Sequence, residues 1–182
     1  TSEELRETHR LANAEAQKYG LTYHSSEWCL LPTSKQYGGI TDDWQKGNHG
    51  DIQAALMMAR VMYSDFVDMN AVSWCYWKAM ELRGDHALIA LHATDGDIHK
   101  GGYISSNKML WVLGNFSRFV RPNYKRIDVK GADDVDTLAA TAFLAPDGEQ
   151  MVVVLVNSSF EGRNLQLELP KQWQKRVKSV KS

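Results

Sequence analysis

The order of secondary structure changes near Pro122, and this change restricts the fold more than any other feature of the 182-residue sequence. Before Pro122, helical and strand-like segments alternate, which predicts a parallel sheet covered by helices. After it, strand-like segments follow one another with no helix between them, which predicts an antiparallel sheet. The sequence therefore predicts an α/β part at residues 1–123 and an all-β part at residues 124–182.

The first part contains the signals of three helices and two strands. An amphipathic helix is predicted at Ser2–Tyr19, because acidic residues occupy its first turn and Gly20 follows its last. Strands are predicted at Leu21–Glu27 and Ala71–Leu82. The other two helices are predicted to run from Asp51 to near Asn70 and from Ser106 or Asn107 to near Val120. The methionines of the middle helix are expected to be core residues, and a loop rich in Gly, Asp and His precedes the last helix.

The second part contains three predicted strands, at Leu138–Leu144, Met151–Val156 and Leu165–Leu169. The first two are separated by the sequence APDGEQ, whose Pro, Asp and Gly residues are typical of a hairpin turn. These strands are expected to form an antiparallel sheet.

Composition excludes several classes of function. The formal net charge of -1 does not indicate binding to nucleic acid. The longest apolar run, Met151–Val156, is too short to span a membrane. Cys29 and Cys75 do not form a zinc pattern or a disulfide framework, and we expect two free thiols that fill small spaces in the core. The six tryptophans exceed what a core of this size needs, and sugars stack on tryptophan.

Glu27 and Trp77 lie near the carboxyl ends of the two strands predicted to be parallel. Ligands of such sheets bind beyond these ends. Consecutive parallel strands are usually neighbours, so the two side chains are expected to lie close together. An indole offers a flat face for a sugar ring, and a carboxylate can contact the polar edge of that ring. A solvated glutamate at the end of a strand is the alternative.

A family resemblance adds to this interpretation. The stretches LTYHSSEWCLLP, AVSWCYWKAMEL and MLWVLGNFSRFVRPNYKRID occur in this order, and together they resemble the C-terminal part of a glycoside hydrolase of family 30. The stretch APDGEQMVVVLVNSS is similar to the hairpin of the β-sandwich in that family. The resemblance implies the last units of a (β/α)8 barrel, from helix six to helix eight, followed by strands of an antiparallel β-sandwich.

The resemblance also implies an activity. Family 30 enzymes hydrolyse β-glycosides with retention, and Glu27 matches the position of the nucleophile. Trp77 matches a tryptophan of the sugar subsite. Retention needs a second carboxyl group about 5–5.5 Å away. In the family this group follows barrel strand four, so we expect it upstream of Thr1, with the rest of the barrel. The chain alone is then expected to be inactive.

Further expectations follow from the same resemblance. The partner is a carbohydrate substrate, no cofactor or metal is needed, and the protein is secreted or extracytoplasmic. Trp28, Tyr37 and Trp44 are further candidates for substrate contact, and each can equally pack beneath the loop at residues 33–50. Trp74 and Tyr76 alternate with Trp77 along the strand, so we expect them on the helix-facing side.

Other residue types with catalytic or ligating potential have weaker patterns. Glu81 is the local candidate for a second carboxyl group and is expected to be a solvated loop acid. His92 and His99 are expected to be surface histidines. Asp95 and Asp97 resemble a calcium loop only faintly, because the remaining ligands are not recognisable.

Two other functions remain open on the sequence. One is a non-catalytic carbohydrate-binding or structural module that keeps barrel and sandwich elements. The other is a cofactor-dependent α/β enzyme, which the absence of a glycine-rich phosphate loop after a strand disfavours.

Overall fold

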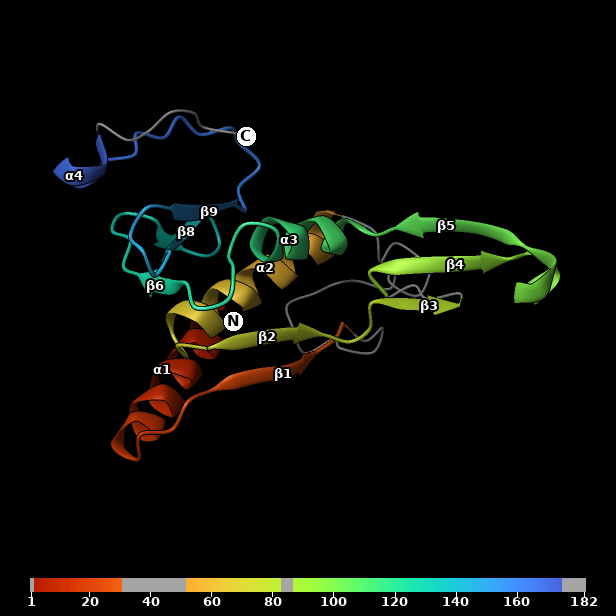
Figure 1. The fold of residues 1–182 in the computed structure, drawn as a ribbon, viewed down its shortest axis with the longest axis horizontal. Helices are drawn as coiled ribbons and strands as arrows, with labels where there is room; N and C mark the ends of the chain where they lie inside the picture. Colours follow the sequence, from red (N-terminus) through yellow and green to blue (C-terminus); the bar gives the residue numbers. More distant parts are fainter. Residues whose placement is uncertain (1, 31–51, 83–86, 175–182) are drawn as a thin grey trace.

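The computed structural model of the chain describes residues 2–30, 52–82 and 87–174. The first part alternates helices and strands, as the sequence predicts, and β1 pairs with β2 in parallel. Figure 1 shows α2 and α3 on the same side of this two-stranded sheet. The elements are α1 (Ser2–Lys18), β1 (His24–Trp28), α2 (Ile52–Val67), β2 (Ser73–Tyr76) and α3 (Lys108–Ser117).

The second part is an antiparallel sheet built around β8. Strand β8 pairs with β9 along its whole length, and its other edge pairs with β6 at one end and with β7 at the other. The hairpin predicted between β8 and β9 is confirmed, and Gly148 in its turn has a φ of 70°, which favours glycine. The elements are β6 (Lys125–Ile127), β7 (Asp133–Asp134), β8 (Leu138–Leu144), β9 (Met151–Asn157) and the short helix α4 (Lys171–Gln174).

The prediction of a strand at residues 165–169 is wrong. This segment has no strand assignment, and Leu165 and Leu167 are exposed. Alternating apolar residues favour a strand only where a neighbouring strand accepts its hydrogen bonds. In the described part of the chain, no strand pairs with this segment.

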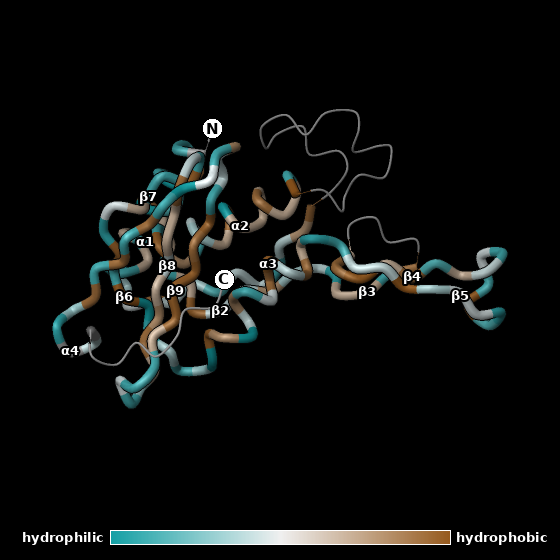
Figure 2. Tube along the Cα trace, turned by 90° about the horizontal axis from the view of Figure 1, so that it is seen from above, coloured by the Kyte–Doolittle hydropathy of each residue, from teal (hydrophilic) through white to brown (hydrophobic). Residues whose placement is uncertain are grey.

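The strand predicted at Ala71–Leu82 is divided, because only Ser73–Tyr76 belongs to β2. Its last residues and the loop predicted after it form a second small sheet. Its strands are β3 (Met80–Leu82), β4 (Ile89–Ala93) and β5 (Gly102–Ser106), and the turns η3 (Thr94–Gly96) and η4 (Ile98–Lys100) join the last two. Strand β4 is central, parallel to β3 and antiparallel to β5. We call these three strands with their turns the β-arm. It projects beyond the carboxyl ends of β1 and β2 (Figures 1 and 2).

Gly102 shows how closely the strands of the β-arm approach each other. Its φ is 152°, and a Cβ atom at this position would collide with the carbonyl oxygen of His92. Only glycine fits this contact between β4 and β5. A glycine that serves as a loop signal in the sequence is therefore part of a paired strand.

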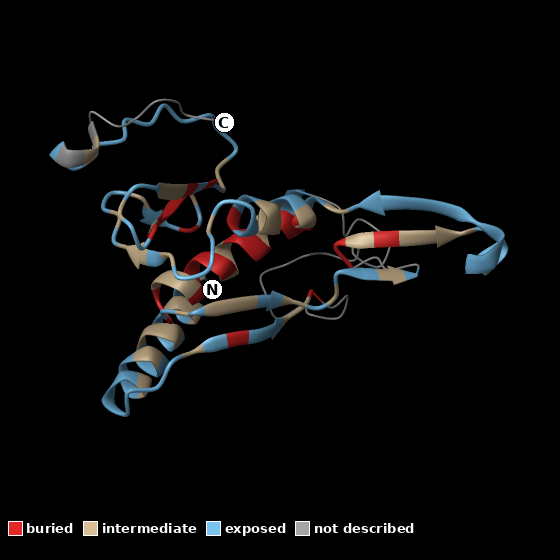
Figure 3. Cartoon of the chain, viewed as in Figure 1, coloured by how far each residue is buried: buried red, intermediate tan, exposed pale blue. Residues whose placement is uncertain are grey.

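The main core surrounds α2. Met58 and Met62 are fully buried, so the prediction that these methionines belong to the core is confirmed. On one side α2 packs against aromatic side chains of β1 and β2, and on the other against Phe143 of β8 and Val154 of β9. The buried residues in Figure 3 follow α2 and its two neighbouring sheets. One helix therefore joins the α/β part to the antiparallel sheet.

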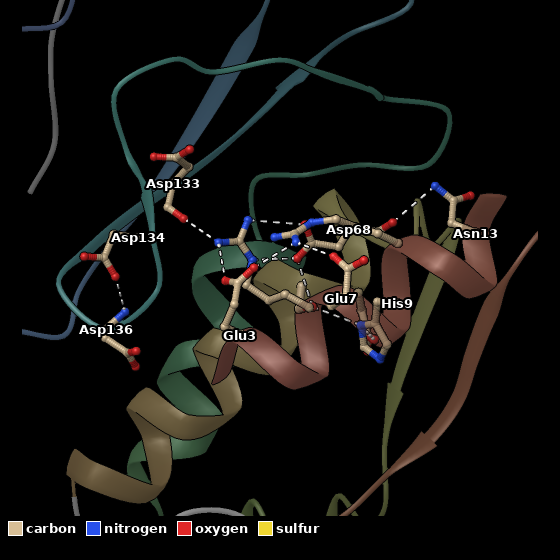
Figure 4. A network of polar contacts seen from close by, with 12 residues as sticks. Glu3, Glu7, His9, Asn13, Asp68, Asp133, Asp134 and Asp136 are labelled. Atoms are coloured by element: carbon tan, nitrogen blue, oxygen red, sulfur yellow. Dashed lines mark hydrogen bonds and ion pairs between the residues drawn. The ribbon is translucent and has the colours of Figure 1, made fainter. Parts of the chain in front are cut away.

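A charged network holds α1 against the end of α2. The buried carboxylate of Asp68 accepts hydrogen bonds from Arg6 Nε at 2.8 Å, Arg10 Nε at 3.2 Å and Ser64 Oγ at 3.0 Å. Arg6 also donates from a second nitrogen to the backbone oxygen of Asp133, at 2.8 Å (Figure 4). The guanidinium group of Arg6 thus connects both helices to the C-terminal sheet.

A second buried carboxylate, Asp65, connects α2 to β1 and β2. It accepts a hydrogen bond from Trp74 Nε1 at 2.8 Å and lies 3.5 Å from His9 Nδ1. Ser25 also contributes a hydrogen bond to it. Burial raises the pKa of Asp65, and these hydrogen bonds and His9 oppose the shift. The first contact fixes Trp74 on the helix-facing side of the sheet.

Replacing Asp68 with alanine should strongly destabilise the protein. The substitution leaves Arg6, whose side chain is 12% exposed, without its buried partner. Breaking a buried pair in this way costs about 3–5 kcal/mol. The free energy of unfolding, measured with urea, should fall by that amount in Asp68→Ala.

The matched control is Glu15→Ala, which removes the exposed pair between Glu15 and Lys18. Exposed pairs contribute roughly 0–1 kcal/mol. Equal stability of the two variants would contradict a structural role of the Asp68 network.

Candidate functional site

A β-bulge in β1 determines which way Glu27 points. Ser25 is paired with Trp74 and Trp28 with Tyr76, so Ser26 and Glu27 together lie opposite Cys75 alone. Without the bulge, alternation would place Glu27 on the side of Ser25, which is buried towards α2. The extra residue re-aims the carboxylate instead. Glu27 and Cys75 are exposed, and each precedes a residue that packs towards α2, namely Trp28 and Tyr76. Alternation therefore places both on the face turned away from α2, which we call the open face.

The aromatic residues of β1 and β2 divide between the two faces. Trp28, Trp74 and Tyr76 form a cluster on the helix-facing side, with ring centroids 5.8–6.4 Å apart. The predicted helix-facing positions of Trp74 and Tyr76 are confirmed. Trp28 packs with them, and its contact with a substrate stays a prediction. Tyr37 and Trp44 lie outside the described residues.

Trp77 follows β2 on the open face. Its backbone N–H donates to the carbonyl oxygen of Trp28 at 2.8 Å. This hydrogen bond extends the pairing of β1 with β2 by one residue. Its side chain is 42% exposed. The ammonium group of Lys78 lies 4.9 Å from the ring centroid and covers one face of the indole.

Glu81 is not the solvated loop acid expected from the sequence. It lies in β3, its side chain is 25% exposed, and its carboxylate pairs with the ammonium group of Lys78. The reason for the difference is that the segment forms a paired strand. Lys78 therefore contacts both the Trp77 ring and Glu81.

The histidines of the β-arm differ from each other. His99 is exposed, as expected. His92 is half-buried, because it stacks on the ring of Tyr103 with centroids 4.3 Å apart. Among the described residues, no group of three or more His, Cys, Asp or Glu residues is arranged to hold a metal ion. Within the same residues, no helix has the length and apolarity needed to cross a bilayer.

The two cysteines are free thiols with different surroundings. Cys29 is half-buried, whereas Cys75 is exposed on the open face, so the expectation that Cys75 fills core space is wrong. Burial raises the pKa of Cys29, and the negative charge of Glu27 raises it further. The second cause places the Glu27 charge close enough to affect the thiol two residues along the chain.

A cavity of about 860 Å³ lies between α2, β2, α3 and β6. Phe66, Trp74, Phe116 and Arg126 are among its lining residues, whereas Glu27 and Trp77 are not. This cavity is therefore separate from the open face.

Comparison with known families finds a match in the C-terminal part of the chain. Residues 125–180 match the family model of the glycosyl hydrolase family 30 beta sandwich domain. The match covers the antiparallel sheet from β6 onwards. Over these residues it agrees with the family resemblance of the sequence.

Two solved structures are similar to the chain. A conserved exported protein from Bacteroides fragilis is 27% identical with a TM-score of 0.69, over 88% of this chain and 34% of that one. The catalytic domain of a family 30 xylanase C from Talaromyces cellulolyticus is 22% identical with a TM-score of 0.53, over 75% of this chain and 28% of that one. The chain thus spans about a third of the length of these proteins.

The proximity of Glu27 and Cys29 predicts a measurable effect on thiol reactivity. In a Cys75→Ser background, the rate of Cys29 alkylation should rise with pH around a pKa above that of an ordinary thiol, because the raised pKa leaves less thiolate at each pH. In Glu27→Gln the profile should shift to lower pH, since one negative charge is gone. The pKa of Cys29 should still be higher than that of an ordinary thiol, because burial is the larger cause of its shift.

The control for this measurement is Glu15→Gln, a charge removal on the exposed side of α1. It should leave the alkylation profile of Cys29 unchanged. An identical profile in Glu27→Gln and Glu15→Gln would show that the Glu27 carboxylate is not close to the thiol.

Proposed function

Because residues 125–180 match the family model of the glycosyl hydrolase family 30 beta sandwich domain, we propose that this chain is the C-terminal portion of a retaining β-glycoside hydrolase. In this proposal, residues 1–123 supply the last units of a (β/α)8 barrel. Glu27 is the nucleophile, and Trp77 forms one wall of a sugar subsite. The observation that carries the proposal is the β-bulge, which turns Glu27 to the open face that Trp77 also occupies.

The chemistry that we propose for Glu27 has two steps. Its carboxylate attacks the anomeric carbon and forms an ester with the sugar, while a second carboxyl group protonates the leaving oxygen. Water then attacks the same carbon, and the second group accepts its proton. The sugar is released with its original anomeric configuration. The strand backbone supports this role, since it holds the nucleophile in one position.

The second carboxyl group is proposed to come from a barrel element outside these 182 residues. Glu81 is less suited to the role, because its carboxylate is paired with Lys78. A general acid needs its carboxyl group within reach of the leaving oxygen, and Lys78 already occupies this one. We propose a β-linked polysaccharide as the substrate. The similarity to the catalytic domain of a xylanase supports this choice.

An extracytoplasmic location is part of the same proposal. Its support is the similarity to an exported protein of Bacteroides fragilis.

The test is the activity of Glu27→Gln in the protein that contains this chain together with the rest of the barrel. Removing a covalent nucleophile should lower kcat by several orders of magnitude on an activated aryl β-glycoside, while the fold stays intact. Azide should restore turnover in Glu27→Ala and give the α-glycosyl azide, because it replaces the missing carboxylate on the same side of the sugar.

The matched control is Glu15→Gln, which should keep full activity. Near-normal hydrolysis by Glu27→Gln would reject the assignment of the nucleophile. An absence of hydrolysis in the unmutated parent protein would favour the alternative, a non-catalytic carbohydrate-binding or structural module. The 182-residue chain alone should not hydrolyse glycosides, since it lacks the proposed acid.

A further inference from the structure

The two faces of the β-arm have different chemistry. On one face, the register places Leu82, Leu91 and Ile104 side by side, which gives an apolar surface. On the other face, Glu81, Ala90 and Ser105 form one row across the three strands, and His92 and Tyr103 form the next. We call this second face, with these five residues, the polar face of the β-arm.

The polar face is continuous with Trp77. Lys78 lies over the Trp77 ring and pairs with Glu81, which is the first residue of the polar face along the chain. A row of contacts thus leads from the indole through Lys78 to the β-arm. Because one strand residue spans roughly 3.3 Å, the row of His92 and Tyr103 lies about 7 Å beyond the row of Glu81.

The far end of the polar face is an ordered aromatic platform. The rings of His92 and Tyr103 are nearly parallel, with an angle of 11° between them. His92 Nε2 is 2.8 Å from Ser105 Oγ, which holds the imidazole in place. Tyr103 is nevertheless 68% exposed. A fixed and exposed ring needs no ordering on binding, so a ligand that stacks on it loses less entropy.

We propose that the polar face of the β-arm is a second saccharide-binding subsite, in which a sugar ring of a β-linked oligosaccharide packs on Tyr103 while another packs at Trp77. This inference rests on the proposed function, because the first sugar occupies the site of Glu27. The occupant is a sugar chain because the face combines a flat aromatic surface with hydroxyl, imidazole and charged groups. An apolar partner would instead match the opposite face of the β-arm.

The test is binding by the 182-residue chain, which does not depend on hydrolysis. Isothermal titration calorimetry with β-linked xylose, glucose and galactose oligomers of one to six units identifies the sugar that binds. Affinity should rise with the number of sugar units once the oligomer is long enough to reach Tyr103. Tyr103→Ala should remove this rise. Its affinity for long oligomers should fall about tenfold, or roughly 1.4 kcal/mol. Its affinity for the shortest ligand that binds should not change.

Two controls separate stacking from a structural effect. Ile104 is 69% exposed, lies next to Tyr103 on β5 and points to the apolar face, so Ile104→Ala should bind every oligomer normally. Tyr103→Phe keeps the ring and should keep most of the length dependence.

The outcomes distinguish this inference from the proposed function. Equal binding of long oligomers by Tyr103→Ala, Ile104→Ala and the unmutated chain would overturn the second subsite, as would the absence of binding by every oligomer. Neither result affects the nucleophile, which is judged by hydrolysis in Glu27→Gln. Conversely, a length-dependent affinity lost only in Tyr103→Ala supports the subsite whatever the result of that hydrolysis test.

Discussion

Two buried carboxylates near the C-terminal end of α2 determine how the rest of the structure is arranged. Asp65 and Asp68 are three residues apart and therefore lie on one face of the helix. Burying charge is costly unless donors surround it, and each acid has several. Asp65 accepts from Trp74 of β2, and Asp68 accepts from Arg6 of α1, which also binds the backbone of the C-terminal sheet. One helix end thus fixes three neighbouring elements.

This arrangement positions the candidate site indirectly. Because Trp74 is held on the helix-facing side, alternation sends Cys75 and Trp77 to the open face. Ser25 of β1 is held near the same acid, and the bulge that follows it lets Glu27 join them. The interactions that join the sheet to α2 through Asp65 are therefore on its buried side. The open face is left with an acid and an indole that do not contribute to the core.

The sequence predicts the order of elements, the parallel pair and the faces of Trp74 and Tyr76, because these depend on periodicity. It does not predict the bulge, since nothing in HSSEW indicates that two residues oppose one. The orientation of Glu27 and the helix-facing position of Trp28 both follow from that irregularity. The β-arm is missed because its strands are short, and β5 begins with Gly102, a residue typical of loops. They are stable only through pairing between residues distant in the sequence.

In the function that we propose, the β-arm also separates two requirements of a glycan-binding site. The proposed nucleophile, Glu27, needs a fixed backbone, which the parallel strand supplies. Recognition of a polymer needs contacts further along the sugar chain, and segments between core elements can supply these without disturbing the core. In this protein that segment is not an irregular loop, because β4 pairs on both sides and Gly102 permits close contact with β5. Pairing fixes the position of Tyr103 relative to β3, so the strand register would set the spacing between the two proposed sugar contacts.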